Sequence, residues 1–469
     1  MPDIVVLGGG VCGLASAVLL ARDGHDVTVL ERDPAPVPDT LDEAWETWER
    51  SGVSQFRQAH FLLAGGREVL DDELPDARDA LVAAGAYPVN MIGLMPPGIS
   101  DRGTRPGDER FATITARRTT VEWVLARIAE AEEGVEVRRG VVASELTATH
   151  PDGTPHVTGV RTEAGEELRA DLVVDAAGRR SQLPGMLAAI GAQAPIEEAE
   201  DSGFIYYTRY FRARDGGRVP QYRSGPLTPM PSFSVLTLPA DNGTWSVTLY
   251  VSTGDRPLKA MRDPQRWDAV LAACPLHAHW ADGEPITDVL PMGGVVDRYR
   301  RMVVDGRPIA TGVVTVGDAW ACTNPSLGRG MSLGLLHARR LRDFVRHHLE
   351  HRVEMAEVWD TVTEVELTPW YRATVEEDRA RHRALEADRR GVSLPPPHDE
   401  AGAVRALLPL ASTADADVYR AMLEIRSCLT VPDKVLRRPG LAARVLEVGR
   451  ALTPPRMGPD RQQLLALLR

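Results

Sequence analysis

Residues 3–31 read DIVVLGGGVCGLASAVLLARDGHDVTVLE, and this stretch decides the fold. Asp3–Leu7 is a short apolar run rich in β-branched residues, which is typical of a strand buried on both faces. Three glycines follow, and Val11–Arg22 then has the composition of a helix that ends before Gly24. Asp26–Leu30 is a second β-branched run. The stretch therefore predicts a strand, a helix and a second strand, which together form a βαβ unit.

The glycines between the first strand and the helix follow the pattern Gly8-x-Gly10-x-x-Gly13. Glycines at this spacing permit a tight turn, a close approach of the backbone to a pyrophosphate, and close packing of the helix on the strand. The helix start, at Val11 and Cys12, offers free N–H groups and the positive end of the helix dipole to the phosphates. The pattern predicts a dinucleotide site.

Two charged residues stand at the end of the second predicted strand. Glu31 comes 18 residues after Gly13, where its carboxylate can accept hydrogen bonds from ribose hydroxyls, and Arg32 follows it. A carboxylate at this place would repel a 2′-phosphate, so NADP is disfavoured as the bound dinucleotide. The fingerprint alone leaves NAD and FAD open.

The composition excludes several classes of protein. The 469 residues carry a net charge of −12, which argues against a nucleic-acid binder. The best apolar stretch, Val5–Ala21, is too short for a membrane span, and no basic residue precedes it as in a signal peptide. We therefore expect a cytoplasmic protein with no integral membrane segment. The four cysteines are scattered, so we expect no metal site, and only Lys259 and Lys434 are lysines.

Two further motifs lie some 300 residues beyond the fingerprint. Gly317-Asp318-Ala319 follows a buried apolar run, and Pro325-x-x-Gly328-x-Gly330-Met331-Ser332 opens a helix. Joined to the N-terminal fingerprint, these motifs resemble the FAD-dependent monooxygenase superfamily with the para-hydroxybenzoate hydroxylase fold. The resemblance covers about residues 1–350 and implies that the bound dinucleotide is FAD.

The resemblance also implies roles for these residues. In that family the Gly-Asp dipeptide binds the ribityl chain, which assigns this role to Asp318. The loop from Pro325 and the backbone from Gly328 through Gly330 and Met331 to Ser332 would follow the pyrimidine edge of the flavin. A helix start at that edge would stabilise the negative charge of reduced flavin.

Other family positions fall on four residues of this chain. Arg118 stands where the family has an arginine near the pyrophosphate or ribityl group, with Arg117 as the alternative. Arg57 and Gln58 precede a helix where relatives place residues that contact the flavin. The backbone of Val142 matches the position that meets the adenine.

One position departs from the family pattern. The segment Asp175-Ala-Ala-Gly-Arg179 has Ala177 where the family motif has an aspartate that is tied to both FAD and NADPH binding. The resemblance thus implies NAD(P)H as a direct or indirect electron donor, and the missing aspartate favours a separate reductase. The motif looks more like that of the squalene-epoxidase-like and polyether-epoxidase-like branch.

The predicted fold is α/β: a Rossmann-like FAD-binding domain, an inserted, mostly antiparallel β-sheet substrate domain and a helical C-terminal region. We assign residues 1–80, 115–185 and 305–350 to the first, 81–114 and 186–304 to the second, and 351–469 to the third. Helices are expected over 43–50, 61–74 and 119–133 and from about 330, and strands over 135–142, 157–162, 172–175, 204–211, 233–238, 244–251 and 308–316.

The predicted reaction is monooxygenation, by hydroxylation or epoxidation, of a hydrophobic polyketide, terpenoid or aromatic compound in secondary metabolism. FAD and O2 supply the chemistry, so no side chain is predicted to be catalytic, and His60, His277 and His279 are expected to be structural. A halogenase needs a lysine between flavin and substrate, and neither lysine is placed for that role. Aromatic residues of the inserted sheet are expected to line the substrate pocket: Tyr206, Tyr210, Phe233, Trp245 and Tyr250.

Two other functions stay open at this point. A flavin-dependent reductase or dehydrogenase of the geranylgeranyl-reductase type would use the same cofactor site. A non-catalytic nucleotide-binding protein would need only the N-terminal fingerprint, and the Gly317-Asp318 motif argues against it.

Overall fold

A parallel sheet forms the centre of the first part of the molecule. The computed structural model describes residues 2–151, 153–349, 351–455 and 457–469. The predicted βαβ unit is present as β1 (Asp3–Leu7), α1 (Val11–Arg22) and β2 (Asp26–Glu31), with β1 and β2 parallel. The five-stranded sheet has the order β20-β9-β1-β2-β5, and all its pairs are parallel. This arrangement confirms the predicted Rossmann-like core.

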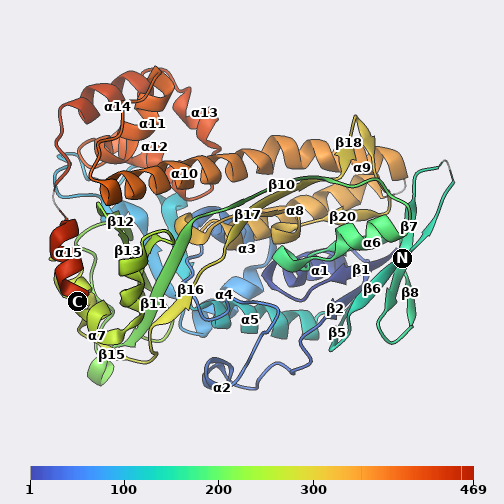
Figure 1. Ribbon diagram of the computed structural model, residues 1–469. Coiled ribbons are helices and arrows are strands. Elements are labelled where there is room, and N and C mark those ends of the chain that lie inside the picture. Colours follow the sequence, from blue (N-terminus) through green and yellow to red (C-terminus); the bar gives the residue numbers. More distant parts are fainter. Residues whose placement is uncertain (1, 152, 350, 456) are drawn as a thin grey trace.

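The remaining elements have the following bounds (Figure 1). The helices are α2 (Leu41–Glu46), α3 (Ala64–Glu73), α4 (Pro75–Ala83), α5 (Arg118–Ala131), α6 (Leu183–Ala189), α7 (Pro264–Ala272), α8 (Gly330–His348), α9 (Arg352–Val362), α10 (Thr368–Arg390), α11 (Glu400–Ala411), α12 (Ala416–Arg426), α13 (Pro432–Leu436), α14 (Leu441–Arg450) and α15 (Arg461–Leu467). The strands are β3 (Tyr87–Asn90), β4 (Ala112–Thr115), β5 (Val135–Arg139), β6 (Ala143–Thr149), β7 (His156–Thr162), β8 (Glu167–Arg169), β9 (Leu172–Asp175), β10 (Ile196–Asp201), β11 (Phe204–Arg212), β12 (Leu227–Pro229), β13 (Ser234–Pro239), β14 (Thr244–Ser252), β15 (Glu284–Pro285), β16 (Leu290–Met292), β17 (Val296–Arg301), β18 (Val303–Val304), β19 (Arg307–Pro308), β20 (Val313–Thr315) and β21 (Ala321–Cys322).

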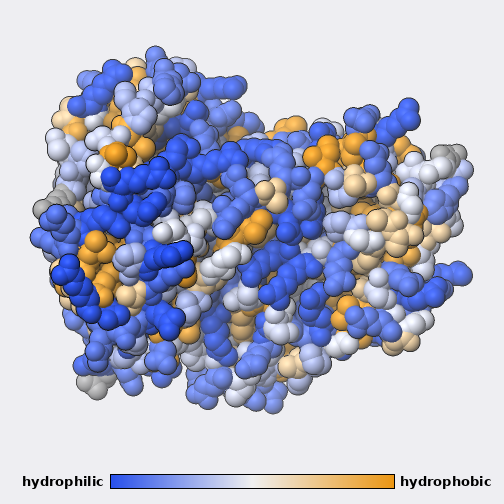
Figure 2. All heavy atoms as spheres, viewed as in Figure 1, coloured by the Kyte–Doolittle hydropathy of each residue, from blue (hydrophilic) through white to orange (hydrophobic). Residues whose placement is uncertain are grey.

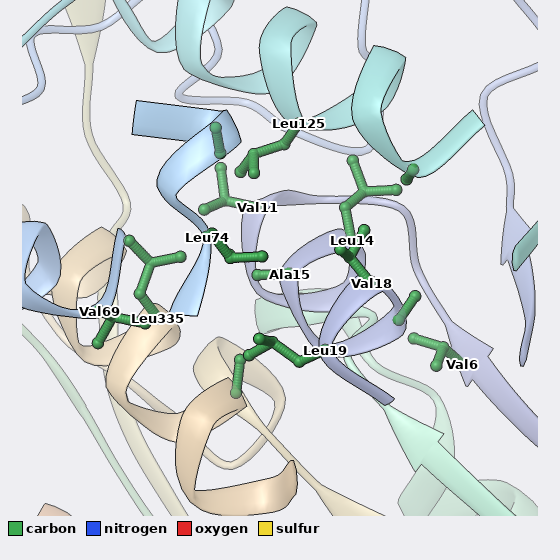
Figure 3. Close-up of a cluster of buried hydrophobic side chains, with 14 of the residues drawn as sticks. Val6, Val11, Leu14, Ala15, Val18, Leu19, Val69, Leu74, Leu125 and Leu335 are labelled. Carbon is green, nitrogen blue, oxygen red and sulfur yellow. The ribbon is translucent and has the colours of Figure 1, made fainter. Parts of the chain in front are cut away.

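Helix α1 is apolar on nearly every side because it is enclosed on nearly every side. Leu14 of α1 is fully buried in a cluster with Val6 of β1, Leu125 of α5 and Leu335 of α8. Figure 3 shows these side chains converging from the sheet and from the neighbouring helices. A helix with a continuous apolar surface is stable in water only when other elements cover all of that surface. The packing therefore fixes the start of α1 against the ends of the strands.

The predicted inserted sheet is antiparallel throughout. Its order is β12-β13-β14-β11-β15, and β16 also pairs with β11. The turn between β13 and β14 contains Asn242 and Gly243, both with positive φ, as the sequence Asp-Asn-Gly favours. One face of the sheet is covered by α7 and α15, whose Trp267 and Leu464 are fully buried in its core.

Long helices link the two parts of the molecule. Helix α9, a π-helical turn at Thr363–Leu367 and α10 follow one another without a break. In Figure 1, α10 runs from the C-terminal helices α11, α12, α13 and α14 towards the parallel sheet. The helical character predicted beyond residue 350 is thus confirmed, and α10 also contacts β14 of the antiparallel sheet.

Several element predictions were wrong in extent: the helix expected over 61–74 begins at Ala64, and the strand expected over 135–142 ends at Arg139. The helix expected over 43–50 ends at Glu46, because the chain then turns Trp48 and Arg50 into the interior. The strand expected over 308–316 is interrupted at Gly312, whose φ is +73°. Thr311 instead accepts a hydrogen bond from Val157 beside β7, so only β20 joins the parallel sheet.

The surface is predominantly polar. Figure 2 shows hydrophobic atoms in scattered groups on the face that it presents, between larger hydrophilic areas. Among the described residues, no helix is long and apolar enough to cross a membrane.

Candidate functional site

The three glycines of the fingerprint serve different purposes. A Cβ atom at Gly8, where φ is +104°, would lie 2.7 Å from the carbonyl oxygen of Ala176. A Cβ atom at Gly13 would lie 2.0 Å from the carbonyl oxygen of Gly8. A Cβ atom at Gly10 would meet nothing within 4 Å. Gly8 and Gly13 therefore allow the close packing of turn and helix, whereas Gly10 leaves the backbone open to a ligand.

A single pocket joins the two predicted motifs. It extends from the turn after β1 and the end of β2, past the loop after β9, to the start of α8. No side chain caps the start of α1 or of α8, so their first N–H groups are available to a bound anion. The predicted site residues in its wall are Gly8, Gly10, Val11, Cys12, Glu31, Arg32, Arg118, Val142, Asp318, Pro325, Gly328, Gly330 and Met331.

Four predicted cofactor-binding residues lie outside this wall, namely Gly13, Arg57, Gln58 and Ser332, and so do all five aromatic residues predicted for the substrate pocket. Gly13 is enclosed behind the turn, as described above. The hydroxyl of Ser332 is fully buried and accepts a hydrogen bond from the backbone N–H of Leu63, 2.9 Å away. Ser332 thus ties α8 to the residues that precede α3.

Arg57 and Gln58 contact protein groups on the side of the antiparallel sheet. The guanidinium of Arg57 lies over the ring of Trp45, 5.0 Å from its centroid, and donates to the Trp45 carbonyl. The carbonyl oxygen of Gln58 accepts a hydrogen bond from the hydroxyl of Tyr210, 2.9 Å away. These contacts anchor the loop on the sheet, and a contact of either side chain with flavin stays a prediction.

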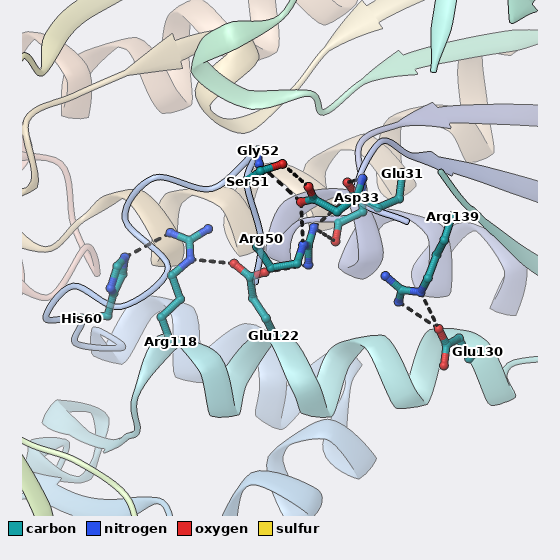
Figure 4. A network of polar contacts seen from close by, with 11 residues as sticks. Glu31, Asp33, Arg50, Ser51, Gly52, His60, Arg118, Glu122, Glu130 and Arg139 are labelled. Atoms are coloured by element: carbon teal, nitrogen blue, oxygen red, sulfur yellow. Dashed lines mark hydrogen bonds and ion pairs between the residues drawn. The ribbon is translucent and has the colours of Figure 1, made fainter. Parts of the chain in front are cut away.

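A buried charge network surrounds the ribose end of the pocket (Figure 4). Arg50 is 1% exposed and donates to Glu31 at 2.6 Å, to Asp33 at 3.1 Å and to Glu122 at 2.9 Å. Glu122 also accepts from Arg118, 2.6 Å away. Buried carboxylates are strongly destabilising unless they are paired, so Arg50 is what permits three of them to stand together. The network fixes the Glu31 carboxylate at the pocket wall.

Arg50 was missed in the sequence, as were Glu122 and Arg179. Arg50 and Arg179 line the pocket, and Glu122 holds the two arginines, Arg50 and Arg118. Arg50 is an isolated charged residue in a chain with many arginines, whereas Glu122 stands four residues after Arg118 and Arg179 ends the Asp-Ala-Ala-Gly-Arg segment, so these two had a local signal. The distance along the chain between Arg50 and Glu122 removes any spacing signal.

Asp318 lies at the other end of the pocket. Burial raises the pKa of the Asp318 carboxyl, and the nearby Arg118 and Arg179 act in the opposite direction. The carboxyl stands at the turn between β20 and α8, with Gly330 next to it across the pocket wall. This placement brings Asp318 near Arg118 and Arg179, and a contact of these side chains with a ligand stays a prediction.

His60 is held in a single neutral form. Its Nδ1 lies 2.9 Å from the Gln58 carbonyl and its Nε2 lies 3.1 Å from Nη1 of Arg118. A carbonyl only accepts and a guanidinium only donates, so Nδ1 carries the proton. Burial and the neighbouring Arg118 lower the pKa of His60 to about 3. His60 lines the pocket as a neutral ring that positions Arg118.

The substituted motif after β9 has its own hydrogen bonds. The carboxylate of Asp175 accepts from the backbone N–H of Ala177 at 3.0 Å and from the hydroxyl of Ser181. Both Asp175 and Ala177 line the pocket, and burial raises the pKa of Asp175. Asp175 therefore shapes the loop, and Ala177 presents a methyl group where the family motif has a carboxylate.

The five aromatic residues predicted for the substrate pocket are all buried, but they do not lie together. Side chains alternate between the two faces of a strand, and Tyr206 and Tyr210 of β11 share one face with Tyr250 of β14. Phe233 and Trp245 belong to the core on the opposite face, with α7 and α15. Only the three tyrosines therefore face the elements that carry the pocket.

The donor groups of the pocket fit an FAD molecule. Two uncapped helix starts face it, a fixed carboxylate stands at Glu31, and the backbone at Gly10 is open. These are the groups that a pyrophosphate, a ribose and a flavin ring require. Among the described residues, no group of three or more His, Cys, Asp or Glu side chains is placed to hold a metal ion.

Comparison with known proteins agrees with this geometry. The family model for FAD dependent oxidoreductases matches residues 3–40, and the model for tryptophan halogenases matches residues 115–192. Protein Rv3254 of Mycobacterium tuberculosis is 30% identical over 72% of this chain and 72% of its own length. FAD-dependent monooxygenase fsr3 of Gibberella fujikuroi is 27% identical over 39% of this chain and 34% of its own. Menaquinone reductase of Mycolicibacterium smegmatis is 24% identical over 71% and 73% of the two chains.

Solved structures show the same fold. PqsL of Pseudomonas aeruginosa, a probable FAD-dependent monooxygenase, superimposes with a TM-score of 0.59 at 18% identity and covers 82% of this chain and 96% of its own. The flavin-dependent brominase Bmp2 superimposes with a TM-score of 0.62 at 14% identity and covers 95% and 98% of the two chains. The fingerprint, the pocket and these relatives together show that the chain belongs to the FAD-dependent oxidoreductases.

Proposed function

We propose that the protein is a monooxygenase that uses bound FAD to insert one oxygen atom of O2 into a hydrophobic small molecule, by hydroxylation or epoxidation. The observation that carries the proposal is the single pocket in which Glu31, Asp318 and two uncapped helix starts converge. The similarity to proteins described as FAD-dependent monooxygenases supports it. The resemblance to the epoxidase branch, a role in secondary metabolism and a place in the cytoplasm are parts of the same proposal.

Each part of the pocket has a proposed role towards FAD, which supplies the oxidation chemistry when bound. Glu31 accepts from the ribose hydroxyls, and the N–H groups at the start of α1 hold the pyrophosphate. Arg118 contributes positive charge between the two ends, and Asp318 accepts from the ribityl chain. The N–H groups at Gly330 and Met331 stabilise negative charge at the pyrimidine edge.

The substrate side of the proposal follows from the antiparallel sheet. We propose the division into an FAD-binding part, a sheet part and a C-terminal helical part at the boundaries given by the sequence. Tyr206, Tyr210 and Tyr250 would form the wall, since they occupy the face towards the pocket, and Phe233 and Trp245 would support it from behind. A wall of this kind excludes water, which protects a reactive oxygen-transfer step.

Electron supply is the second part of the proposal. Ala177 offers no carboxylate, and Asp175 is occupied within its own loop. We therefore propose that NAD(P)H delivers its electrons through a separate reductase. Stopped-flow reduction of the FAD-loaded protein by NADH and by NADPH checks this, because fast and saturable bleaching by either would show direct use.

The test of the reaction uses labelled oxygen. The purified protein with FAD, an electron source and a pooled extract of hydrophobic metabolites is incubated under 18O2. A product heavier by one labelled oxygen supports the proposal. A product that gains two hydrogens and no label would replace it with a reductase.

The reductase is the second candidate because one relative is described as a menaquinone reductase. Halogenation is disfavoured, although one family model and one solved structure belong to halogenases. A halogenase needs a lysine between flavin and substrate. Lys259 follows β14 and Lys434 lies in α13, and neither lines the pocket.

A further inference from the structure

Most of the buried acidic residues that the structure describes have an arginine partner. The buried acids that form an ion pair are Glu31, Asp33, Asp108, Glu122, Asp241, Asp255, Asp415 and Glu424. Within the part of the chain that the structure describes, the buried acids without an ion pair are Asp175, Asp297 and Asp378. Asp175, the last residue of β9, is hydrogen-bonded to the loop that follows, so Asp297 and Asp378 are the two that need an explanation.

These two carboxyls lie behind the loop that follows β21. In that loop Thr323 and Pro325 line the pocket, whereas the intervening Asn324 turns away from it. The backbone N–H of Asn324 donates to the carboxylate of Asp297, 2.6 Å away. The hydroxyl of Ser326, in the same loop, donates to Asp378 of α10. The loop therefore has the pocket on one side and the carboxyl pair on the other.

Two buried polar atoms at this place make no hydrogen bond of ordinary geometry, although the amide of Asn324 still acts on the Asp378 carboxyl and lowers its pKa. The two atoms are Nδ2 of Asn324, which is 1% exposed, and Oδ2 of Asp378, which is 4% exposed. Oδ1 of Asn324 accepts from the hydroxyl of Tyr206, 2.6 Å away. A buried donor and a buried carboxyl oxygen without well-formed hydrogen bonds are costly in a finished core, so the cluster has capacity for one more proton.

We propose that Asp297 and Asp378 share one proton behind the flavin loop, and that this proton keeps negative charge away from the flavin ring when FAD is reduced. The proposal rests on the proposed function only in requiring bound FAD. The proton comes from solvent and is returned to it, and the electrons go to the flavin alone. Asp378 acts here as a positioning residue, through Asn324 and Ser326.

The surroundings explain why one proton is retained. Burial and the neighbouring Asp297 raise the pKa of Asp378 to about 8, and burial raises the pKa of Asp297 to about 6. Like charges in a buried site cannot both ionise without a large cost. The other titratable or charged groups facing the pair are Glu377, Glu200, Asp201, Arg379, Tyr206, Tyr250, Tyr371 and Cys322. Arg379 is the cation among them, and its guanidinium is held by Glu200 at the surface.

The test measures the reduction potential of bound FAD against pH by dye equilibration. Adding negative charge to the flavin raises the proton affinity of the pair, so the potential gains an extra slope above about pH 8, where Asp378 would otherwise lose its proton. Each pH unit is a tenfold change in proton activity, which is about 30 mV for a two-electron couple when one proton is linked. Asp378→Asn should remove this slope and leave FAD bound.

Two further variants distinguish the sharing of a proton by Asp297 and Asp378 from a purely structural role. Asp297→Asn removes the like charge and should move the onset of the slope to lower pH. Ser326→Ala removes a donor to the ionised carboxyl and should move the onset to higher pH. Opposite shifts support the proton-sharing pair. An unchanged slope in Asp378→Asn, or shifts in the same direction, would overturn it. Absence of bound FAD in the unmodified protein would instead refute the proposed function.

Discussion

The two ends of the pocket treat buried carboxylates in opposite ways. At the ribose end, Glu31, Asp33 and Glu122 share Arg50, and every carboxylate has a fixed partner. At the ring end, Asp297 and Asp378 have no ion pair with any residue that the structure describes. A paired carboxylate holds its geometry at any ordinary pH, whereas an unpaired buried carboxyl changes its charge when its surroundings change. The carboxylates near Glu31 therefore keep a fixed position and charge, whereas the charge of the Asp297 and Asp378 pair can change with pH or with the charge of a bound cofactor.

The largest effect is expected when Arg50, the cation shared by Glu31, Asp33 and Glu122, is removed. Arg50→Ala would leave three buried carboxylates without a partner. Breaking a buried ion pair costs about 3–5 kcal/mol, so urea unfolding should show a loss of that size or larger. FAD should be lost as well, because Glu31 would no longer be held at the wall.

Arg138→Ala is the matched control for this change. Arg138 pairs with the exposed Glu166 at the protein surface, where ion pairs contribute little. The unfolding midpoint of this variant should stay close to that of the unmodified protein. A similar small change in Arg50→Ala would show that the buried network can relax.

Because Asp378 has no ion pair, the free energy of unfolding should depend on pH. The folded-state pKa of Asp378 is raised to about 8, whereas the unfolded value is about 3.9. Between these values the folded protein binds one more proton, so the free energy of unfolding falls as pH rises, by up to about 1.4 kcal/mol per pH unit. Asp378→Asn removes this loss.

The measurement is urea unfolding of the unmodified protein and of Asp378→Asn at pH 6, 7 and 8. The variant should gain stability relative to the unmodified protein at each step. Asp255→Asn is the contrasting variant, since Asp255 is buried but paired with Arg461 at 2.6 Å. A constant difference between Asp378→Asn and the unmodified protein would mean that Asp378 is ionised throughout.

Sequence reasoning recovered the parts of the site that local patterns encode. The turn at Gly8 and Gly10 and the Asp318 element carry their own spacing, and the structure brings them to one pocket. The face of the sheet that each side chain occupies was harder to predict. Phe233 and Trp245 are aromatic residues of the expected segment, but a shift of one residue moves a side chain to the opposite face.

Long-range partners could not be predicted at all. Arg50, which follows α2, meets Glu122 of α5 because α2 packs against α5, and no spacing along the chain predicts that contact. Asp378 lies in a region without any family motif, and it forms no ion pair with any residue that the structure describes. Such features depend on which segments pack together, which only the structure shows.

The open backbone at Gly10 separates cofactor binding from folding. Gly10→Val places its side chain where the protein has nothing within 4 Å, and φ is −87°, so the chain should fold normally. The same side chain would occupy the path of the pyrophosphate, and FAD affinity should fall at least tenfold, which is about 1.4 kcal/mol. Flavin absorbance after gel filtration measures the retained cofactor.

Gly185→Val is the control for this substitution, because Gly185 is exposed and also has nothing within 4 Å. It should keep full flavin occupancy. Gly13→Ala should behave differently from both, since its methyl group would lie 2.0 Å from a carbonyl oxygen and should lower the melting temperature. Full occupancy in Gly10→Val would move the pyrophosphate away from this turn.

The smallest expected effect tests how the carboxyl pair is linked to the sheet. Tyr206→Phe removes the hydroxyl that donates to Asn324 at 2.6 Å, and leaves Oδ1 of the amide without that donor. The cost should be about 1 kcal/mol in urea unfolding, as for one buried hydrogen bond.

Tyr210→Phe is the matched control, because its hydroxyl donates to a backbone carbonyl on the same face of the sheet at 2.9 Å. Both variants should lose similar stability. Only Tyr206→Phe should change the pH above which the reduction potential of bound FAD shows its extra slope. The reason is that only Tyr206 contacts the loop between the Asp297 and Asp378 pair and the pocket. Equal pH profiles for the two variants would show that Asn324 keeps its position without Tyr206.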